Sequence, residues 1–359
     1  MPFVVQKIAC GLKFKLIPII TMQRQSYQLK AGNIGNLKLV TSELPDPVGN
    51  EVTVAVKAVG LNFADIFAMF GLYSATPKGV FIPGLEYAGE VIKVGKDCKE
   101  YKVGDRIMGV TRFGGYTTHL NMDEGHILPL PADWSYEEGA AYLVQVLTAF
   151  YGLRNLGAIR ENYTILIHSA AGGVGILANR IAKKYGAYTI GTVGSEAKVD
   201  FIKKEGYDAA IVRNKKTFEK DLQNALGGRE LNIVMECIGG SFFKDAYEIL
   251  APEGRVIFYG AARYASPGKR PNYFKVLYEH ITRPRIDPQS MSEINKGILG
   301  FNLIYLYERV ELMHSLIQEL KDLDIGKPHV GHTFTFDKLV EAIELFQTGK
   351  TIGKVVVMV

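Results

Sequence analysis

The chain has 359 residues, enough for two domains, and its 47% hydrophobic and 22% charged residues exclude a disordered polypeptide. The 42 Lys and Arg residues exceed the 37 Asp and Glu residues by a net charge of +5, which is too small and too scattered to indicate a nucleic-acid surface. Cys10, Cys98 and Cys237 form no CxxC pair, so we expect no disulfide framework and no cysteine-rich zinc lobe, which favours a reducing, cytoplasmic compartment.

The first segment, residues 1–21, mixes apolar residues with charges. Lys7, Lys13 and Lys15 interrupt the apolar runs, so no stretch reaches the roughly 20 residues that a membrane-spanning helix needs. The mixed order of charges also differs from that of a signal peptide. We expect an extension outside the fold. The alternative is a basic and apolar arm that makes peripheral contact with membranes.

The next segment, up to about Trp134, predicts short strands and turns. Glu51–Val59 and Tyr87–Val94 alternate with the period of two that is typical of half-buried strands, and Lys102–Val110 predicts another turn and strand.

A helix is predicted to begin at Ser135, because Glu137 and Glu138 place acidic residues in its first turn. The apolar run Ala140–Tyr151 is expected to continue this helix.

From Thr164 onward, strand and helix patterns alternate, which indicates βαβ units on a parallel sheet. The predicted strands are Thr164–His168, Ala187–Val193, Ala209–Val212, Leu231–Glu236 and Arg255–Tyr259, and the predicted helices are Val174–Tyr185 and Lys198–Glu205. Residues 323–359 return to the β-rich style around a helix at Phe336–Thr348, and Gly353–Val359 is the last strand.

The segment between the first of these strands and its helix is rich in glycine. Laid on the pattern G-x-G-x-x-G, it has Ala170, Gly172 and Gly175 at the three glycine positions. A strand before and a helix after it are the context that a dinucleotide-binding turn needs. Gly172 allows the backbone to approach a pyrophosphate, and Gly175 allows the helix to pack on the strand. The alternative is a glycine-rich turn of another α/β protein.

The end of the second parallel strand indicates which dinucleotide binds. An NAD site carries an acidic residue there for the ribose 2′-hydroxyl, whereas this chain has Gly194 and Ser195. Lys198 and Arg213 follow, and two cations with a hydroxyl suit the 2′-phosphate of NADP(H). The alternatives are that both cations are ordinary solvated charges, or that Glu196 binds the ribose of NAD(H).

Four motifs of the chain are Gly60–Asp65 (GLNFAD), Pro83–Gly89 (PGLEYAG), Val103–Ile107 (VGDRI) and Ala170–Gly175 (AAGGVG). Together they resemble the zinc-free quinone oxidoreductase group of the medium-chain dehydrogenase/reductase superfamily. Residues 287–296 and 300–303 resemble the vesicle amine transport protein-like branch, and the likeness covers residues 22–359. It implies an α/β chain with a GroES-like β-rich catalytic domain, residues 22–134 and 309–359, and a Rossmann domain with a doubly wound parallel sheet, residues 135–308.

The zinc-binding members of this superfamily hold a catalytic metal with Cys, His and Cys. At those positions this chain has Asn62, Leu85 and, nearby, Gln145, none of which is a usual zinc ligand. We therefore expect no metal site.

The resemblance implies a catalytic group around the nicotinamide. Asn62 and Tyr73 are the expected hydrogen-bond donors to a substrate oxygen, Thr148 is expected near the nicotinamide, and Asp65 is expected to position the backbone. The alternatives are a turn residue for Asn62 and a packing role for Tyr73. Phe67 stands where the group pattern has a second tyrosine, which leaves the proton source open.

The expected cofactor is NADP(H), and its expected contacts are Ala171, Gly172, Gly173, Val174, Gly175, Ser195, Lys198, Arg213, Ile238, Gly239, Phe258, Gly260, Phe301 and Asn302. The leading hypothesis is an NADPH-dependent reductase of a small-molecule quinone or an α,β-unsaturated carbonyl. The alternatives are an enoyl-thioester reductase, or an NADP- or lipid-associated binding protein with little turnover. The resemblance also implies a homodimer in which a late edge strand pairs with its copy, and the apolar segment Gly297–Tyr305 is the expected strand. The alternative is that this strand is fully internal.

Overall fold

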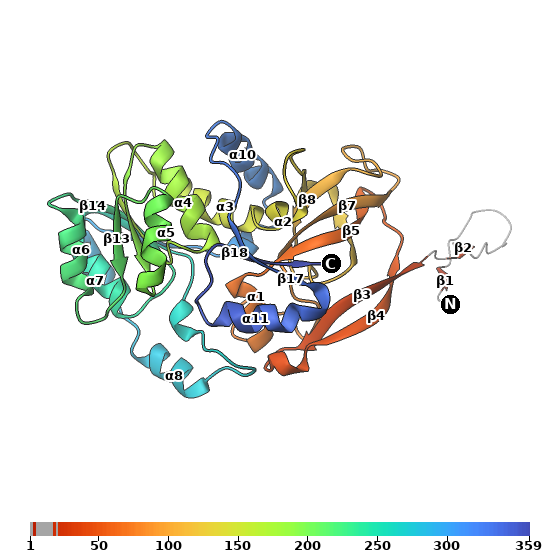
Figure 1. Ribbon diagram of the computed structural model, residues 1–359, viewed down its shortest axis with the longest axis horizontal. Coiled ribbons are helices and arrows are strands. Elements are labelled where there is room, and N and C mark those ends of the chain that lie inside the picture. Colours follow the sequence, from red (N-terminus) through yellow and green to blue (C-terminus); the bar gives the residue numbers. More distant parts are fainter. Residues whose placement is uncertain (1–2, 5–16, 19–20) are drawn as a thin grey trace.

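The computed structural model describes residues 3–4, 17–18 and 21–359, and it contains a β-rich part and a parallel-sheet part (Figure 1). Strands β1 (Phe3–Val4) and β2 (Ile17–Pro18) pair antiparallel. The prediction for residues 1–21 otherwise lies outside the described residues.

The β-rich part is built on a seven-stranded sheet with the order β10-β8-β7-β5-β18-β17, in which β9 also pairs with β5. Its strands are β5 (Glu51–Gly60), β7 (Glu86–Val94), β8 (Arg106–Val110), β9 (His119–Asp123), β10 (Ile127–Pro129), β17 (Val330–Thr335) and β18 (Lys354–Met358). A second sheet joins β3 (Thr21–Lys30), β4 (Lys38–Pro45) and β6 (Val80–Phe81). The end of the chain thus returns to a sheet formed mainly by its first third.

The second part holds a six-stranded, entirely parallel sheet with the order β13-β12-β11-β14-β15-β16. Its strands are β11 (Thr164–Ile167), β12 (Tyr188–Val193), β13 (Ala209–Val212), β14 (Leu231–Glu236), β15 (Leu250–Phe258) and β16 (Gly297–Gly300). The order reverses at β11, as in a doubly wound dinucleotide-binding sheet. The predicted α/β fold, GroES-like plus Rossmann, is confirmed.

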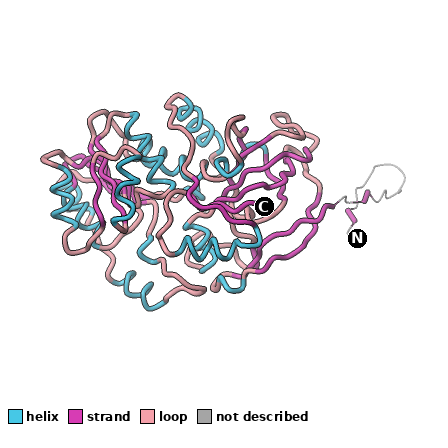
Figure 2. The backbone as a smooth tube through the Cα atoms, in the orientation of Figure 1, coloured by secondary structure: helices cyan, strands magenta, loops and turns pink. Residues whose placement is uncertain are grey.

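Helices cover both faces of this parallel sheet (Figure 2). The side chains of β11 show the division, because Ile165 and Ile167 pack in one buried cluster and Leu166 packs in the other. The first cluster contains residues of α3 (Leu143–Phe150), α4 (Gly173–Lys184), α5 (Val199–Lys204) and α10 (Val310–Lys321), and the second contains residues of α6 (Phe218–Leu226) and α7 (Ser241–Ile249). Helix α10 falls in the expected 309–359 segment, yet it shares a core with α3 and α4.

The remaining helices are α1 (Phe63–Phe70), α2 (Tyr136–Gly139), α8 (Tyr273–Ile281), α9 (Pro288–Glu293) and α11 (Leu339–Gln347). In the part of the chain that the structure describes, no helix is both long and apolar enough to cross a bilayer.

Two predicted elements were wrong in extent. The single helix expected from Ser135 to Tyr151 is broken between α2 and α3, although Ser135 caps α2 reciprocally with Glu138 as a helix start should. The strand expected at Gly297–Tyr305 ends at Gly300, because Asn302 begins a 3-10 helix at Leu303–Leu306. The short strand β16 is nevertheless an edge of the parallel sheet.

Candidate active site

The glycine-rich turn between β11 and α4 is shaped for an anion. Ser169 adopts a left-handed conformation with φ 54°, so it makes the sharp turn that a glycine makes in the usual pattern. A Cβ on Gly175 would lie 2.6 Å from the Ser169 carbonyl oxygen, so only glycine fits there. Helix α4 begins after Gly172 with no side-chain cap, which leaves its first backbone N–H groups for a ligand.

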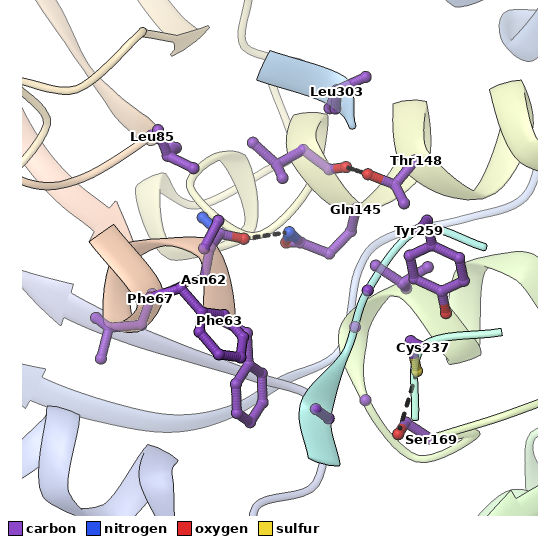
Figure 3. A pocket seen from close by; sticks show the side chains of 18 of the residues that line it. Asn62, Phe63, Phe67, Leu85, Gln145, Thr148, Ser169, Cys237, Tyr259 and Leu303 are labelled. Atoms are coloured by element: carbon purple, nitrogen blue, oxygen red, sulfur yellow. Dashed lines mark hydrogen bonds between the residues drawn. The ribbon is translucent and has the colours of Figure 1, made fainter. Parts of the chain in front are cut away.

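This turn borders a cavity of about 960 Å³ that is lined by residues of both parts of the chain. The volume lies in the upper range of ligand pockets, which is roughly 300–1,000 Å³. In Figure 3, Asn62, Phe63, Phe67 and Leu85 lie on one side of the cavity, and Ser169, Cys237 and Tyr259 lie on the other. The predicted residues that line it are Asn62, Tyr73, Thr148, Ala171, Gly172, Gly173, Val174, Gly175, Lys198, Arg213, Ile238, Phe258, Gly260, Phe301 and Asn302.

Three predicted residues do not line the cavity: Asp65, Ser195 and Gly239. The buried Asp65 carboxylate accepts the Asn62 backbone N–H at 2.8 Å and the Tyr116 hydroxyl at 2.9 Å, so it fixes the start of α1. Ser195 is exposed at the end of β12. The Gly239 N–H donates to the Glu236 carboxylate at 2.8 Å.

Two cations lie at the end of the cavity where the 2′-phosphate is expected. Lys198 Nζ donates to the Gly349 and Thr351 carbonyl oxygens, both at 2.7 Å. The Arg213 guanidinium donates to the Thr192 hydroxyl at 3.1 Å. Burial, with the nearby Arg213 charge, lowers the pKa of Lys198. A bound anion would relieve the repulsion between these two cations.

A buried chain of polar groups supports Arg213 from behind. The Thr192 hydroxyl accepts from Arg213 and lies 2.9 Å from His168 Nδ1. The other ring nitrogen of His168, Nε2, lies 3.3 Å from the Glu236 carboxylate. Burial alone would raise the pKa of Glu236, but His168 and the amides of Ile238 and Gly239 lower it overall. Thr192, His168 and Glu236 thereby connect Arg213 to the turn after β14.

A second polar cluster consists of Asn62, Glu86, Gln145 and Lys354, and all of these except Glu86 line the cavity. All four side chains are buried. The Lys354 ammonium donates to Asn62 Oδ1 at 2.8 Å, to Gln145 Oε1 at 2.5 Å and to the Glu86 carboxylate. Gln145 Nε2 donates to Asn62 Oδ1 at 2.8 Å, the contact marked in Figure 3. Burial raises the pKa of Glu86 and lowers that of Lys354, while their mutual attraction opposes both shifts.

Two members of this cluster, Asn62 and Gln145, are residues that the resemblance led us to compare with zinc ligands. Both bind Lys354, whose ammonium supplies a positive charge. Among the described residues, no group of three or more His, Cys, Asp or Glu could hold a metal ion. The sequence analysis missed Glu86 and Lys354, although Glu86 belongs to the motif PGLEYAG and Lys354 begins the last strand.

The predicted donors differ in what they offer to a substrate. Asn62 Nδ2 is directed inward, to Glu86 Oε1 at 2.9 Å and to the Gly60 carbonyl oxygen at 3.3 Å. The Thr148 hydroxyl donates to the Val144 carbonyl oxygen at 2.7 Å within its own helix. The Tyr73 hydroxyl donates to Asn302 Oδ1 at 2.6 Å and thus joins the loop after α1 to the second residue after β16.

Family models match both parts of the chain. The model "Alcohol dehydrogenase GroES-like domain" matches residues 49–132, and "Zinc-binding dehydrogenase" matches residues 173–286. The human "Synaptic vesicle membrane protein VAT-1 homolog" is 31% identical over 317 residues, which cover 88% of this chain and 80% of that protein. The chain belongs to the quinone oxidoreductase group of the medium-chain dehydrogenase/reductase superfamily, near the VAT-1 homologues.

Solved structures of this superfamily share the fold. The human VAT-1 homolog-like protein aligns with a TM-score of 0.79 and 26% identity over 94% of this chain and 98% of that chain. The quinone oxidoreductase of Thermus thermophilus, solved also with NADPH, aligns with a TM-score of 0.73 and 26% identity over 93% of this chain and 100% of that chain. This superfamily member is an oxidoreductase whose cofactor is NADP(H), and the uncapped turn and the paired cations fit that dinucleotide.

Proposed function

We propose that the protein is an NADPH-dependent reductase that transfers hydride to a quinone or an α,β-unsaturated carbonyl without zinc. The observation that carries the proposal is Lys354, whose buried ammonium binds Asn62 and Gln145 at the positions of zinc ligands. Two amides and an ammonium give no lone pair set that zinc favours.

The geometry of the cavity supports the proposed cofactor contacts. The first backbone N–H groups of α4 would hold the pyrophosphate, and Lys198 and Arg213 would hold the 2′-phosphate. Ser195 does not line the cavity, but it directly follows Gly194, which does. The ends of β15 and β16, at Phe258 and Phe301, would border the nicotinamide half. Bound NADPH would supply the hydride from its nicotinamide ring.

The chain's own contribution is to orient the acceptor and to stabilise negative charge on its oxygen. Tyr73 is suited to this role because burial raises its pKa to about 12, so its hydroxyl stays protonated as a donor. Its present acceptor, Asn302 Oδ1, lies on the cavity wall, and a substrate oxygen would replace or share that bond. Asn62 acts through the cluster with Lys354, since its own N–H groups are already bonded.

The test is turnover by the purified protein. A panel of simple quinones, enals and enoyl thioesters is assayed with NADPH and with NADH, beside elemental analysis for zinc. We expect NADPH oxidation by quinones or enals with no tightly held zinc. One zinc per chain would refute the zinc-free mechanism, turnover of thioesters alone would indicate an enoyl-thioester reductase, and cofactor binding without any turnover would indicate a binding protein.

Tyr73 gives the sharpest variant. Tyr73→Phe removes the hydroxyl donor and keeps the ring, which packs edge-on against Phe113 with 6.4 Å between the ring centroids. We expect kcat to fall about 10- to 100-fold, the equivalent of ~1.5–3 kcal/mol for a hydrogen bond to a developing charge. The dissociation constant of NADPH should be unchanged. An unchanged kcat would assign Tyr73 to packing.

We further propose a homodimer in which β16 pairs with its copy, because this strand leaves an open edge on the parallel sheet. Light scattering at micromolar concentration that gave a monomer mass would refute it. The proposed division into domains, 22–134 with 309–359 and 135–308, is tested by limited proteolysis.

A further inference from the structure

Helix α8 presents its apolar side to solvent. Its large apolar residues recur at i, i+1, i+4, i+5 and i+8, which places them on one helical face. Phe274 is 89% exposed, and the other four are each at least 58% exposed. These five residues, which we call the α8 face, are Tyr273, Phe274, Leu277, Tyr278 and Ile281.

The opposite side of α8 is attached to the protein by polar groups. Lys275 Nζ donates to the Ala265 carbonyl oxygen at 2.5 Å, and Glu279 lies 3.6 Å from the Arg263 guanidinium. Arg263 also donates to the Glu279 carbonyl oxygen at 2.6 Å. A surface helix normally buries its apolar stripe and exposes its charges, so α8 is oriented in the reverse sense. An exposed apolar face of this kind indicates an interaction surface.

The charges around the α8 face are positive. Lys269, Arg270, Arg283 and Arg285 flank the helix in sequence and are exposed. The only acidic residue between positions 269 and 285 is Glu279, which is turned inward to Arg263. An apolar face with aromatic residues and a cationic border is complementary to the surface of an anionic bilayer.

A second copy of the chain is a poorer match. A two-fold contact places the same patch of both subunits together. The α8 face of one copy would therefore bring its four flanking cations close to the same four cations of the other copy. Like charges that meet across an interface oppose association.

The same segment also borders the cavity. Ala262, Tyr264, Ala265 and Pro267 precede α8 and line the cavity, and Val276 lines it from within α8. Figure 1 shows α8 at the lower margin of the molecule, below the parallel-sheet part. A surface that held α8 would thus lie beside the wall of the proposed substrate site.

We propose that the α8 face docks on anionic lipid bilayers, and that the site reduces an apolar acceptor dissolved in the bilayer. The second half of this proposal rests on the proposed function. The apolar side chains of α8 enter the boundary between headgroups and acyl chains, and the flanking cations bind lipid phosphate or carboxylate groups. A long-chain quinone would then reach the cavity without crossing water.

The first experiment is co-sedimentation of the full chain with vesicles. We expect binding to vesicles of equimolar phosphatidylcholine and phosphatidylserine, and at least about tenfold weaker binding to phosphatidylcholine alone or at high salt, because several cations each contribute about 1 kcal/mol. Phe274→Asp with Leu277→Asp should abolish binding, and Arg283→Glu with Arg285→Glu should weaken it. Val48→Asp, at an exposed apolar residue outside the cavity wall, is the matched control and should bind like the wild type.

The second experiment separates docking from catalysis. The double Asp variant should reduce a water-soluble benzoquinone like the wild type and lose most of its activity toward a long-chain quinone in anionic vesicles. Unchanged vesicle binding by that variant, or equal wild-type binding to both kinds of vesicle, would overturn the docking. A change of the variant from dimer to monomer in light scattering would assign the face to a second copy instead. Intact docking with no turnover of any quinone would refute the proposed function alone.

Discussion

Two lysines of the cavity wall, Lys198 and Lys354, have opposite surroundings. Lys354 is only 4% exposed and is bonded to the carboxylate of Glu86. Lys198 is partly exposed, and in the described part of the chain its ammonium bonds only to the uncharged carbonyl oxygens of Gly349 and Thr351. The first charge is neutralised inside the protein, whereas the second is left for an anion from outside.

This difference shows that burial and partners, more than residue type, decide what a cation does in a site. A buried ion pair is costly to break because the remaining charge stays desolvated. A half-exposed cation without an acid partner can be removed at little cost to the fold, but its loss weakens a bound phosphate. Lys354 and Lys198 should therefore respond to equivalent substitutions in different ways.

The largest expected effect is on the free energy of unfolding when Lys354 is replaced. Lys354→Met leaves Glu86 buried without its cation, so we expect the free energy of unfolding to fall by about 3–5 kcal/mol. Chemical denaturation measures this free energy of unfolding. The double variant Lys354→Met with Glu86→Gln should recover much of the loss, because no uncompensated charge remains. Lys198→Met is the matched control: it loses two partly exposed bonds to uncharged carbonyl oxygens and should lower the free energy of unfolding by only about 1 kcal/mol. Equal losses of unfolding free energy from both lysine variants would remove the distinction between the two lysines.

The next effect concerns Asp65, whose carboxylate accepts the backbone N–H of Asn62 in the cluster around Lys354. Burial raises the pKa of Asp65 from 3.8 to about 7, which the backbone of Asn62 and the Tyr116 hydroxyl partly oppose. An acid with a raised pKa binds its proton more tightly in the folded protein, so its contribution to stability is greatest below pH ~4 and is lost as the pH rises to about 7.

The variant Asp65→Asn imitates the protonated acid. We expect it to reduce the decline of unfolding free energy between about pH 4 and pH 7 by a few kcal/mol, since each pKa unit corresponds to ~1.4 kcal/mol. The exposed Asp322→Asn should leave the pH profile unchanged. A wild-type profile that rises over this interval would show that Asp65 is ionised in the fold.

The third effect is on the preference for NADPH over NADH when Lys198 is replaced. Lys198→Ala should weaken NADPH binding about tenfold or more, because a charge-assisted bond to the 2′-phosphate is lost and ~1.4 kcal/mol is a factor of ten. NADH has no such phosphate, so its KM should barely change. Calorimetry with NADP+ and with NAD+ gives the same comparison without turnover. Equal weakening of both cofactors would place Lys198 in a supporting role, and a wild-type preference for NADH would make Glu196 the ribose ligand.

The smallest effect tests the support behind Arg213. Thr192→Val keeps the shape of the side chain but removes the hydroxyl that joins Arg213 to His168. We expect the dissociation constant of 2′,5′-ADP to rise about threefold, because Arg213 keeps its charge and its bond to the Thr192 carbonyl oxygen and loses only one orienting hydrogen bond, and that of 5′-AMP to stay constant. A larger loss for 5′-AMP than for 2′,5′-ADP would show that Thr192 supports the strand and not the cation.

Local patterns predicted the fold and most of the cavity wall. The period of two in Glu51–Val59 and the alternating strands and helices after Thr164 led to the two sheets, because such patterns depend on neighbouring residues alone. The phosphate turn was found for the same reason, although Ser169 makes its left-handed turn. The end of β16 was misjudged, because Asn302, whose backbone is still extended, precedes a 3-10 helix at Leu303–Leu306 and bonds Tyr73 in a distant part of the chain.

The sequence by itself determined the fold class and the dinucleotide turn, and it led to the expectation that Asn62, Leu85 and Gln145 stand where zinc-binding members have their ligands. Only the tertiary structure decided that Lys354, 292 positions after Asn62, bonds the side-chain amides of Asn62 and Gln145. It also decided that Asn62 donates inward while Tyr73 faces the cavity, and that α8 exposes its apolar side. Hydrogen bonds and burial between distant residues depend on how strands such as β5 and β18 pair, and no periodicity within one segment encodes that pairing.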